Sequence, residues 1–113
     1  MIKSSYTRLF FILGLIFLSH AASSAVHEVK EGGSIQAAVT KAQRGDVIRV
    51  FPGTYHETVY VDKDDISLIG VVEDGQWPHL DGQKILNDAI LYSGNGFSVE
   101  WFKITHYKGN AIM

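Results

Sequence analysis

Three aspartates in one short segment have types and a spacing that could do chemistry. Asp62, Asp64 and Asp65 stand almost side by side. Carboxylate oxygens are the ligands that calcium takes in proteins, so this segment could hold calcium in a longer parent protein. The segment lacks the glycine and the distal glutamate of an EF-hand loop, and aspartate is also a common turn former. A solvated turn between two strands is therefore the alternative, and the sequence indicates no other cofactor.

Two histidines stand near carboxylates, an arrangement used for proton transfer. His56 directly precedes Glu57, but neighbouring residues of a strand point to opposite faces, so these two should not converge. His79 and Asp81 are two positions apart and should share one face of a strand. That pair could transfer a proton or supply two metal ligands, with structural hydrogen bonding near Gly82 as the simpler alternative.

A third group combines cationic and aromatic side chains, which can contact sugars by charge and by stacking. Alternate residues from 103 to 107 should point outward from a strand whose Ile104 points inward, and His106 would join them after a bend. We predict Trp101, Lys103 and His106 as candidate substrate-binding residues. The alternative is an ordinary polar outer face. Other rings that could stack on sugars, or simply favour strands, are Tyr55, Tyr60, Trp77, Tyr92 and, beside the lysine, Tyr107.

Composition narrows the classes of function. Ten Lys and Arg against twelve Asp and Glu give a net charge of -2, so the chain lacks the basic surface that nucleic-acid binding needs. The absence of cysteine excludes disulfides, thiolate nucleophiles, cysteine-bound zinc and iron–sulfur clusters. With 113 residues, 46% of them hydrophobic, one small globular domain is expected.

The first residues have the pattern of a secretory signal peptide. Lys3 and Arg8 precede an apolar run from Leu9 to Leu18, and small residues then lead to Ala25. A helix needs about 20 apolar residues to span a bilayer, so this run is too short for a retained anchor. We predict a signal peptide over residues 1–25, no membrane span after cleavage, and a secreted or periplasmic protein.

The rest of the chain contains one helix pattern followed by short strand patterns. Apolar residues recur at helical spacing over about 34–44, with Ser34 as N-cap and Gly45 just past the end. Downstream, short alternating runs surround residues 48–50, 59–61 and 66–68, separated by turn-forming residues. Within residues 97–105, the apolar residues that should face inward change from odd-numbered to even-numbered positions. This change predicts a bend at Glu100-Trp101.

Stacked coils explain these strands better than paired hairpins. The strands are short, no second helix is available as a crossover, and no two-residue Asn-Gly hairpin is present. In a parallel β-helix, each coil gives a few short strands that pair with those of the next coil. The segments 89–91 and 110–112 lie about one such repeat apart. A small antiparallel β-domain is the alternative.

The order of motifs also resembles a known superfamily. These motifs are Gly33–Ala38 (GSIQAA), Arg44–Val50 (RGDVIRV), Pro52–Glu57 (PGTYHE) and Ile66–Gly70 (ISLIG). Together they resemble the opening of right-handed parallel β-helix proteins of the pectin lyase-like superfamily, over most of residues 33 to 113. The resemblance implies an all-β solenoid whose N-terminal amphipathic helix caps the open end of the coil. The superfamily includes pectin methylesterases, polysaccharide lyases and uronan epimerases.

The resemblance carries the functional expectation. An exported protein whose parent binds or modifies an extracellular polysaccharide is expected. The alternative is a non-catalytic periplasmic β-helix, either adhesin-like or of the type that assists copper-site maturation. The superfamily's catalytic motifs have no match in this sequence, and its last residues read as an open strand. We therefore expect an N-terminal fragment without a complete active site, prone to edge-to-edge self-association.

Overall fold

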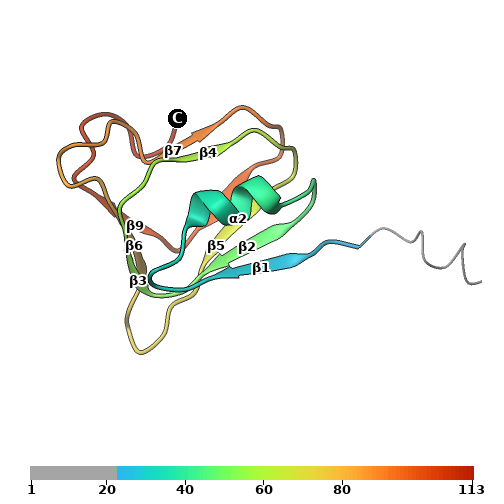
Figure 1. Ribbon diagram of the computed structural model, residues 1–113, viewed down its shortest axis with the longest axis horizontal. Coiled ribbons are helices and arrows are strands. Elements are labelled where there is room, and N and C mark those ends of the chain that lie inside the picture. The colour runs from blue at the N-terminus through green and yellow to red at the C-terminus, as the bar shows by residue number, and fades with distance from the viewer. Residues whose placement is uncertain (1–22) are drawn as a thin grey trace, which may run out of the picture.

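The computed structural model describes residues 23–113 (Figure 1). Most of the predicted signal peptide, residues 1–25, lies outside the described residues. Within residues 23–113, no helix is both long enough and apolar enough to cross a membrane.

Short strands and one short helix follow one another along the chain. In order they are β1 Val26–Val29, α2 Ile35–Lys41, β2 Val47–Val50, β3 Gly53–Tyr55, β4 Val59–Val61, β5 Ser67–Gly70, β6 Pro78–Asp81, β7 Ile90–Tyr92, β8 Ser98–Glu100 and β9 Lys103–Thr105. They form three sheets, with strand orders β1-β2-β5-β8, β3-β6-β9 and β4-β7. Each strand pair is parallel.

This topology is a β-solenoid of about three turns, with one sheet on each side of the coil (Figure 1). The predicted all-β parallel β-helix is therefore confirmed, and the antiparallel alternative is wrong. Ile112 forms a parallel bridge with Ile90, which confirms the predicted repeat between segments 89–91 and 110–112.

The core lies inside the coil because alternate side chains of each strand point inward. Ile48 and Leu68 are in register on neighbouring strands and both are fully buried. Tyr55 and Leu80 form the matching row of the second sheet, and Val59 with Ile90 that of the third. The alternate positions point outward and include polar residues such as Arg49, Thr54 and His79.

The helix lies across one end of the coil and packs against β1, β2 and β4 (Figure 1). Ser34 is its N-cap, as predicted, and the Ser34 hydroxyl accepts a hydrogen bond from the amide of Ala37. The helix ends at Lys41 rather than near residue 44, because Ala42 is already extended. Asp46 accepts the amide of Gln43 at 2.9 Å and fixes the turn that follows.

The predicted bend at Glu100-Trp101 is present between β8 and β9. Trp101 has φ of +65°, in the left-handed region that a bulky side chain seldom occupies. Its carbonyl oxygen lies directly over Gly70 of the preceding coil, where a Cβ atom would come within 2.0 Å of it. Gly70 therefore allows two successive coils to approach closely at this corner.

Candidate functional site

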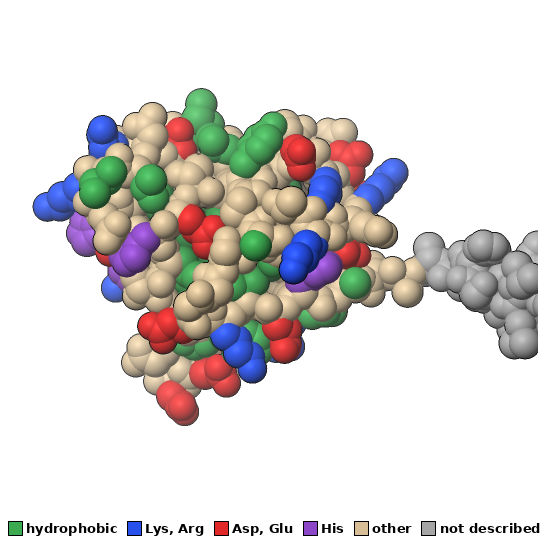
Figure 2. All heavy atoms as spheres, in the orientation of Figure 1, with side chains coloured by type: hydrophobic (Ala, Val, Ile, Leu, Met, Phe, Trp, Pro, Cys, Tyr) green, Lys and Arg blue, Asp and Glu red, His purple; other side chains and the backbone are tan. Residues whose placement is uncertain are grey.

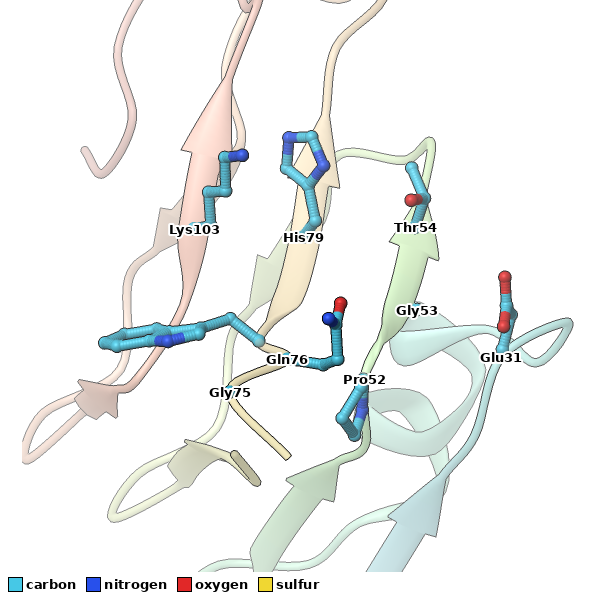
Figure 3. Close-up of a pocket in the computed structure, with 9 residues that line it drawn as sticks. Glu31, Pro52, Gly53, Thr54, Gly75, Gln76, His79 and Lys103 are labelled. Carbon is cyan, nitrogen blue, oxygen red and sulfur yellow. The ribbon is translucent and has the colours of Figure 1, made fainter. Parts of the chain in front are cut away.

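The outer face of β3-β6-β9 carries a row of polar side chains. Thr54, His79 and Lys103 are in register on the three neighbouring strands. The strand alternation that buries Tyr55 and Leu80 turns these three side chains outward. In Figure 3 they rise from adjacent strands on the same side of the sheet.

A groove of about 470 Å³ runs across this row. Pro52 and Thr54 form its side toward β3, while Gln76 and Glu31 project at its rim (Figure 3). Its full lining is Glu31, Pro52, Gly53, Thr54, Gly75, Gln76, Trp77, His79 and Lys103. The groove therefore offers carboxylate, amide, hydroxyl, imidazole and ammonium groups beside an aromatic ring.

Two tryptophans meet at the end of this groove. The rings of Trp77 and Trp101 have centroids 5.5 Å apart and planes tilted by 53°. Both remain open to solvent, with 42% of Trp77 and 55% of Trp101 exposed. Trp101 does not line the groove itself but a second hollow of about 200 Å³, together with Gly70 and Val72. An exposed aromatic pair beside polar groups is an arrangement that binds amphipathic ligands.

Histidine side chains gather at the left of the view in Figure 2. Asp81 links His56 with His106 by hydrogen bonds, and the Thr105 hydroxyl links His79 with His106. His79 Nε2 lies 2.6 Å from the Thr105 hydroxyl. His106 Nδ1 lies 3.0 Å from Asp81 Oδ1, and His56 Nδ1 lies 2.9 Å from the Asp81 carbonyl oxygen. Asp81 thus joins two histidines that come from the coils before and after it.

The surroundings shift two of these groups. Burial lowers the pKa of His79 below its ordinary value of 6.5, and the charge of Lys103 lowers it further. The backbone amide of Gln83 holds the pKa of Asp81 below its ordinary value, and the hydrogen bond to His106 adds to this effect. The surroundings therefore favour the neutral form of His79 and the charged form of Asp81.

The predicted sugar-contacting residues separate into two sets. Lys103 lines the groove and Trp101 contacts Trp77 of the groove, whereas His106 lies beside Asp81. Tyr107 was predicted to point outward, and this is wrong. Its half-buried ring reaches back so that its hydroxyl donates to the Glu57 carbonyl oxygen at 2.6 Å, and burial raises its pKa to about 12.

The other tyrosines do not form part of the groove. Tyr55 is buried, and its hydroxyl donates to the Phe51 carbonyl oxygen at 2.8 Å, so a stacking role for Tyr55 is wrong. Tyr60 and Tyr92 are exposed but lie on the β4-β7 sheet.

The aspartates predicted as calcium ligands lie in the turn between β4 and β5. The carboxylate of Asp64 accepts the amide of Asn95 at 2.9 Å, and that of Asp65 pairs with Arg44 at 3.1 Å. Across residues 23–113, no three His, Cys, Asp or Glu side chains gather as a metal ion would require. The turn interpretation therefore describes Asp64 and Asp65.

The sequence pattern did not reveal Glu31 or Gln76, and it indicated His56 only beside Glu57, not beside Asp81. Glu31 precedes the helix and Gln76 lies in a corner loop, so neither belongs to a strand pattern. A signal did exist for His56, because Asp81 follows it by 25 residues and His106 follows Asp81 by 25. Stacked coils place residues one repeat apart next to each other.

Comparisons with protein-family models, with curated proteins and with solved structures gave no match.

Proposed function

We propose that this is an exported β-solenoid, right-handed and of the pectin lyase-like kind, that binds an extracellular polysaccharide in the groove on the β3-β6-β9 face. The exported location follows from the sequence pattern of residues 1–25, and the superfamily from the motif order described above. The groove adds a place for the ligand.

The exposed pair of Trp77 and Trp101 is the observation that carries the proposal. Large aromatic rings are usually buried, so two adjacent exposed tryptophans without a covering partner favour a binding role. The apolar face of a pyranose ring stacks on such a surface, while its hydroxyls need hydrogen-bonding groups nearby. Gln76, His79 and Lys103 supply those groups within the same groove.

The groove is also open rather than enclosed, as a polymer requires. It lies over the outer face of β3, β6 and β9, and Trp101, which contacts Trp77 of the groove, lines a second hollow with Gly70 and Val72. A chain of sugars could therefore lie along the surface with several residues in contact.

Tryptophan fluorescence tests the proposal directly. The chain has only two tryptophans, Trp77 in the groove lining and Trp101 in contact with it, so intrinsic tryptophan emission reports on this part of the surface. Titration of the protein with a panel of extracellular polysaccharides should shift or quench this emission. Trp77→Ala should weaken binding at least about fivefold by calorimetry, since one stacking ring contributes on the order of 1–3 kcal/mol.

Two further variants define the result. Trp101→Asn keeps a residue that tolerates the positive φ and should weaken binding similarly. Tyr92→Ala removes an exposed ring from the β4-β7 sheet and should leave affinity unchanged. Equal losses in the tryptophan and tyrosine variants, or saturation by no polysaccharide of the panel, would contradict the proposal.

A further inference from the structure

We propose that the signal peptide is cut after Ala21, so that the mature protein begins at Ala22 and keeps Ser24 and Ala25 in its fold. The inference rests on the exported location that is part of the proposed function. It adds a processing site, the peptide bond between Ala21 and Ala22, and a mature chain four residues longer than a cut after Ala25 would leave.

The sequence around the end of the apolar run offers several positions to a signal peptidase. This enzyme requires a small side chain at the last residue before the cut and another two residues earlier. Three pairs meet that requirement, which are Ser19 with Ala21, Ala22 with Ser24, and Ser23 with Ala25. The pattern alone does not choose among them, but the contacts of the folded chain distinguish them.

The backbone of Ala25 forms a hydrogen bond on each side. Its amide donates to the carboxylate of Asp46 at 2.9 Å, and its carbonyl oxygen accepts the amide of Val47 at 3.0 Å. The second bond starts the ladder between β1 and β2, in which Val26 is in register with Val47. A cut after Ala25 would remove both groups from β1, which is the edge strand of its sheet.

The amide of Ala25 matters because its acceptor is buried. Only 5% of Asp46 is exposed, and its Oδ2 atom binds the amide of Gln43 and the ring of His27, each at 2.9 Å. The amide of Ala25 contacts the other oxygen, Oδ1. A buried carboxylate needs donors in place of water, and an oxygen that loses its donor destabilises the fold. The cut after Ala25 would remove the donor to Oδ1.

Contacts with the coil also include the residue before Ala25. The Ser24 hydroxyl lies beside Gly45, where a Cβ atom would be 3.5 Å from it. A cut after Ser24 would keep Ala25 but remove this side chain. Of the three positions, the cut after Ala21 alone preserves the contacts of both residues.

The N-terminus of the exported protein tests the inference. The full 113-residue chain is expressed in a bacterium with a general secretory pathway, and the exported product is analysed by N-terminal sequencing and intact mass. The expected product begins at Ala22. A product that begins at Ala25 or Val26 overturns the inference and leaves export intact. An uncut product overturns the processing site together with the exported location, whereas polysaccharide binding is measured separately on whichever product forms.

Two matched variants identify the residue that the peptidase reads. Leucine is too large for the position before the cut. Ala21→Leu should therefore abolish the product that begins at Ala22, whereas Ala25→Leu should leave that N-terminus unchanged. Pulse labelling of the precursor follows the cut independently of the stability of the product. Loss of cleavage in the Ala25 variant with normal cleavage in the Ala21 variant overturns the inference.

Discussion

Carboxylate and ammonium groups lie both around α2 and on the β3-β6-β9 face. Those around the helix bind its backbone, whereas those at the sheet face are exposed. At the helix, the Glu57 carboxylate accepts the amides of Ile35 and Gln36, at 2.9 and 3.0 Å, and the Ser34 hydroxyl at 3.1 Å. Lys63 Nζ donates to three backbone carbonyl oxygens at the other end of the helix, those of Val39, Thr40 and Ala42. On the sheet face, Glu31 and Lys103 are exposed at a groove.

The difference shows which charges are structural and which are available to a ligand. A carboxylate at the helix N-terminus and an ammonium at its C-terminus each complement the helix dipole and satisfy backbone groups that the helix leaves unpaired. Because the two charges come from the coil, they fasten the short helix across its end. Among residues 23–113, the charges at the groove bind no such backbone groups, and they are exposed to solvent.

Glu57 should give the largest effect on stability. We expect Glu57→Gln to lower the free energy of unfolding by about 2 kcal/mol, because an ionised acceptor of three donors is lost. Urea unfolding followed by circular dichroism measures the change. Glu31→Gln is the matched control at the groove, and a loss there above about 0.5 kcal/mol would break the distinction between the two regions.

Lys63 should have a somewhat smaller effect. Lys63→Met leaves carbonyl oxygens of the helix C-terminus unpaired and should cost about 1.5 kcal/mol of unfolding free energy. Lys103→Met, the matched change on the sheet face, should alter stability by less than about 0.5 kcal/mol. Equal stability losses for the two lysines, measured by the same urea titration, would show that Lys63 does not fasten the helix.

The contribution of Asp46 to stability should be lost only in acid. Amides of Gln43 and Ala25 and the ring of His27 lower its pKa from 3.8 to about 2. Because the pKa is lowered in the folded state, the stabilisation is complete above about pH 4 and is lost as the pH falls toward 2. Thermal unfolding between pH 5 and pH 2 should show a shallower decline in Tm for Asp46→Asn than for the unmodified protein.

Asp81 is the matching carboxylate on the sheet face with which Asp46 can be compared. Its pKa is also lowered, but by one backbone amide and an exposed histidine on the sheet face. Asp81→Asn should therefore change the acid dependence of Tm less than Asp46→Asn does. A larger change in the Asp81 variant would place the main acid-sensitive contact on the sheet face.

The sequence predicted the parts of the fold that local patterns determine. The helix N-cap at Ser34, the alternating strands and the bend at Trp101 each follow from a few neighbouring residues. The strand β1 was missed, because its four residues have no distinctive pattern and it pairs with β2, which lies beyond the helix.

The site was harder to predict because the length of a coil varies. Val47 pairs with Ser67, but Ser67 pairs with Ser98, so successive repeats in one sheet differ in length. Corner loops absorb the difference, so a repeat measured in one sheet does not align the residues of another. In the β3-β6-β9 sheet the repeat is nearly constant, at 25 residues from Thr54 to His79 and 24 from His79 to Lys103. Trp77 and Trp101 are also 24 residues apart, but without the strand register the sequence indicated them only as separate candidates.

The parallel pairing of all strands also bears on how the chain folds. No sheet can begin from a local hairpin, because the closest paired strands are about 20 residues apart, as Val47 and Ser67 are. Each ladder needs a long loop to close before any contact forms, and domains rich in such non-local contacts fold slowly. A slowly folding chain stays extended for longer after synthesis, which is the state that passes most readily through a narrow protein-conducting channel. Slow folding would thus keep the proposed exported protein competent for translocation until it reaches the far side.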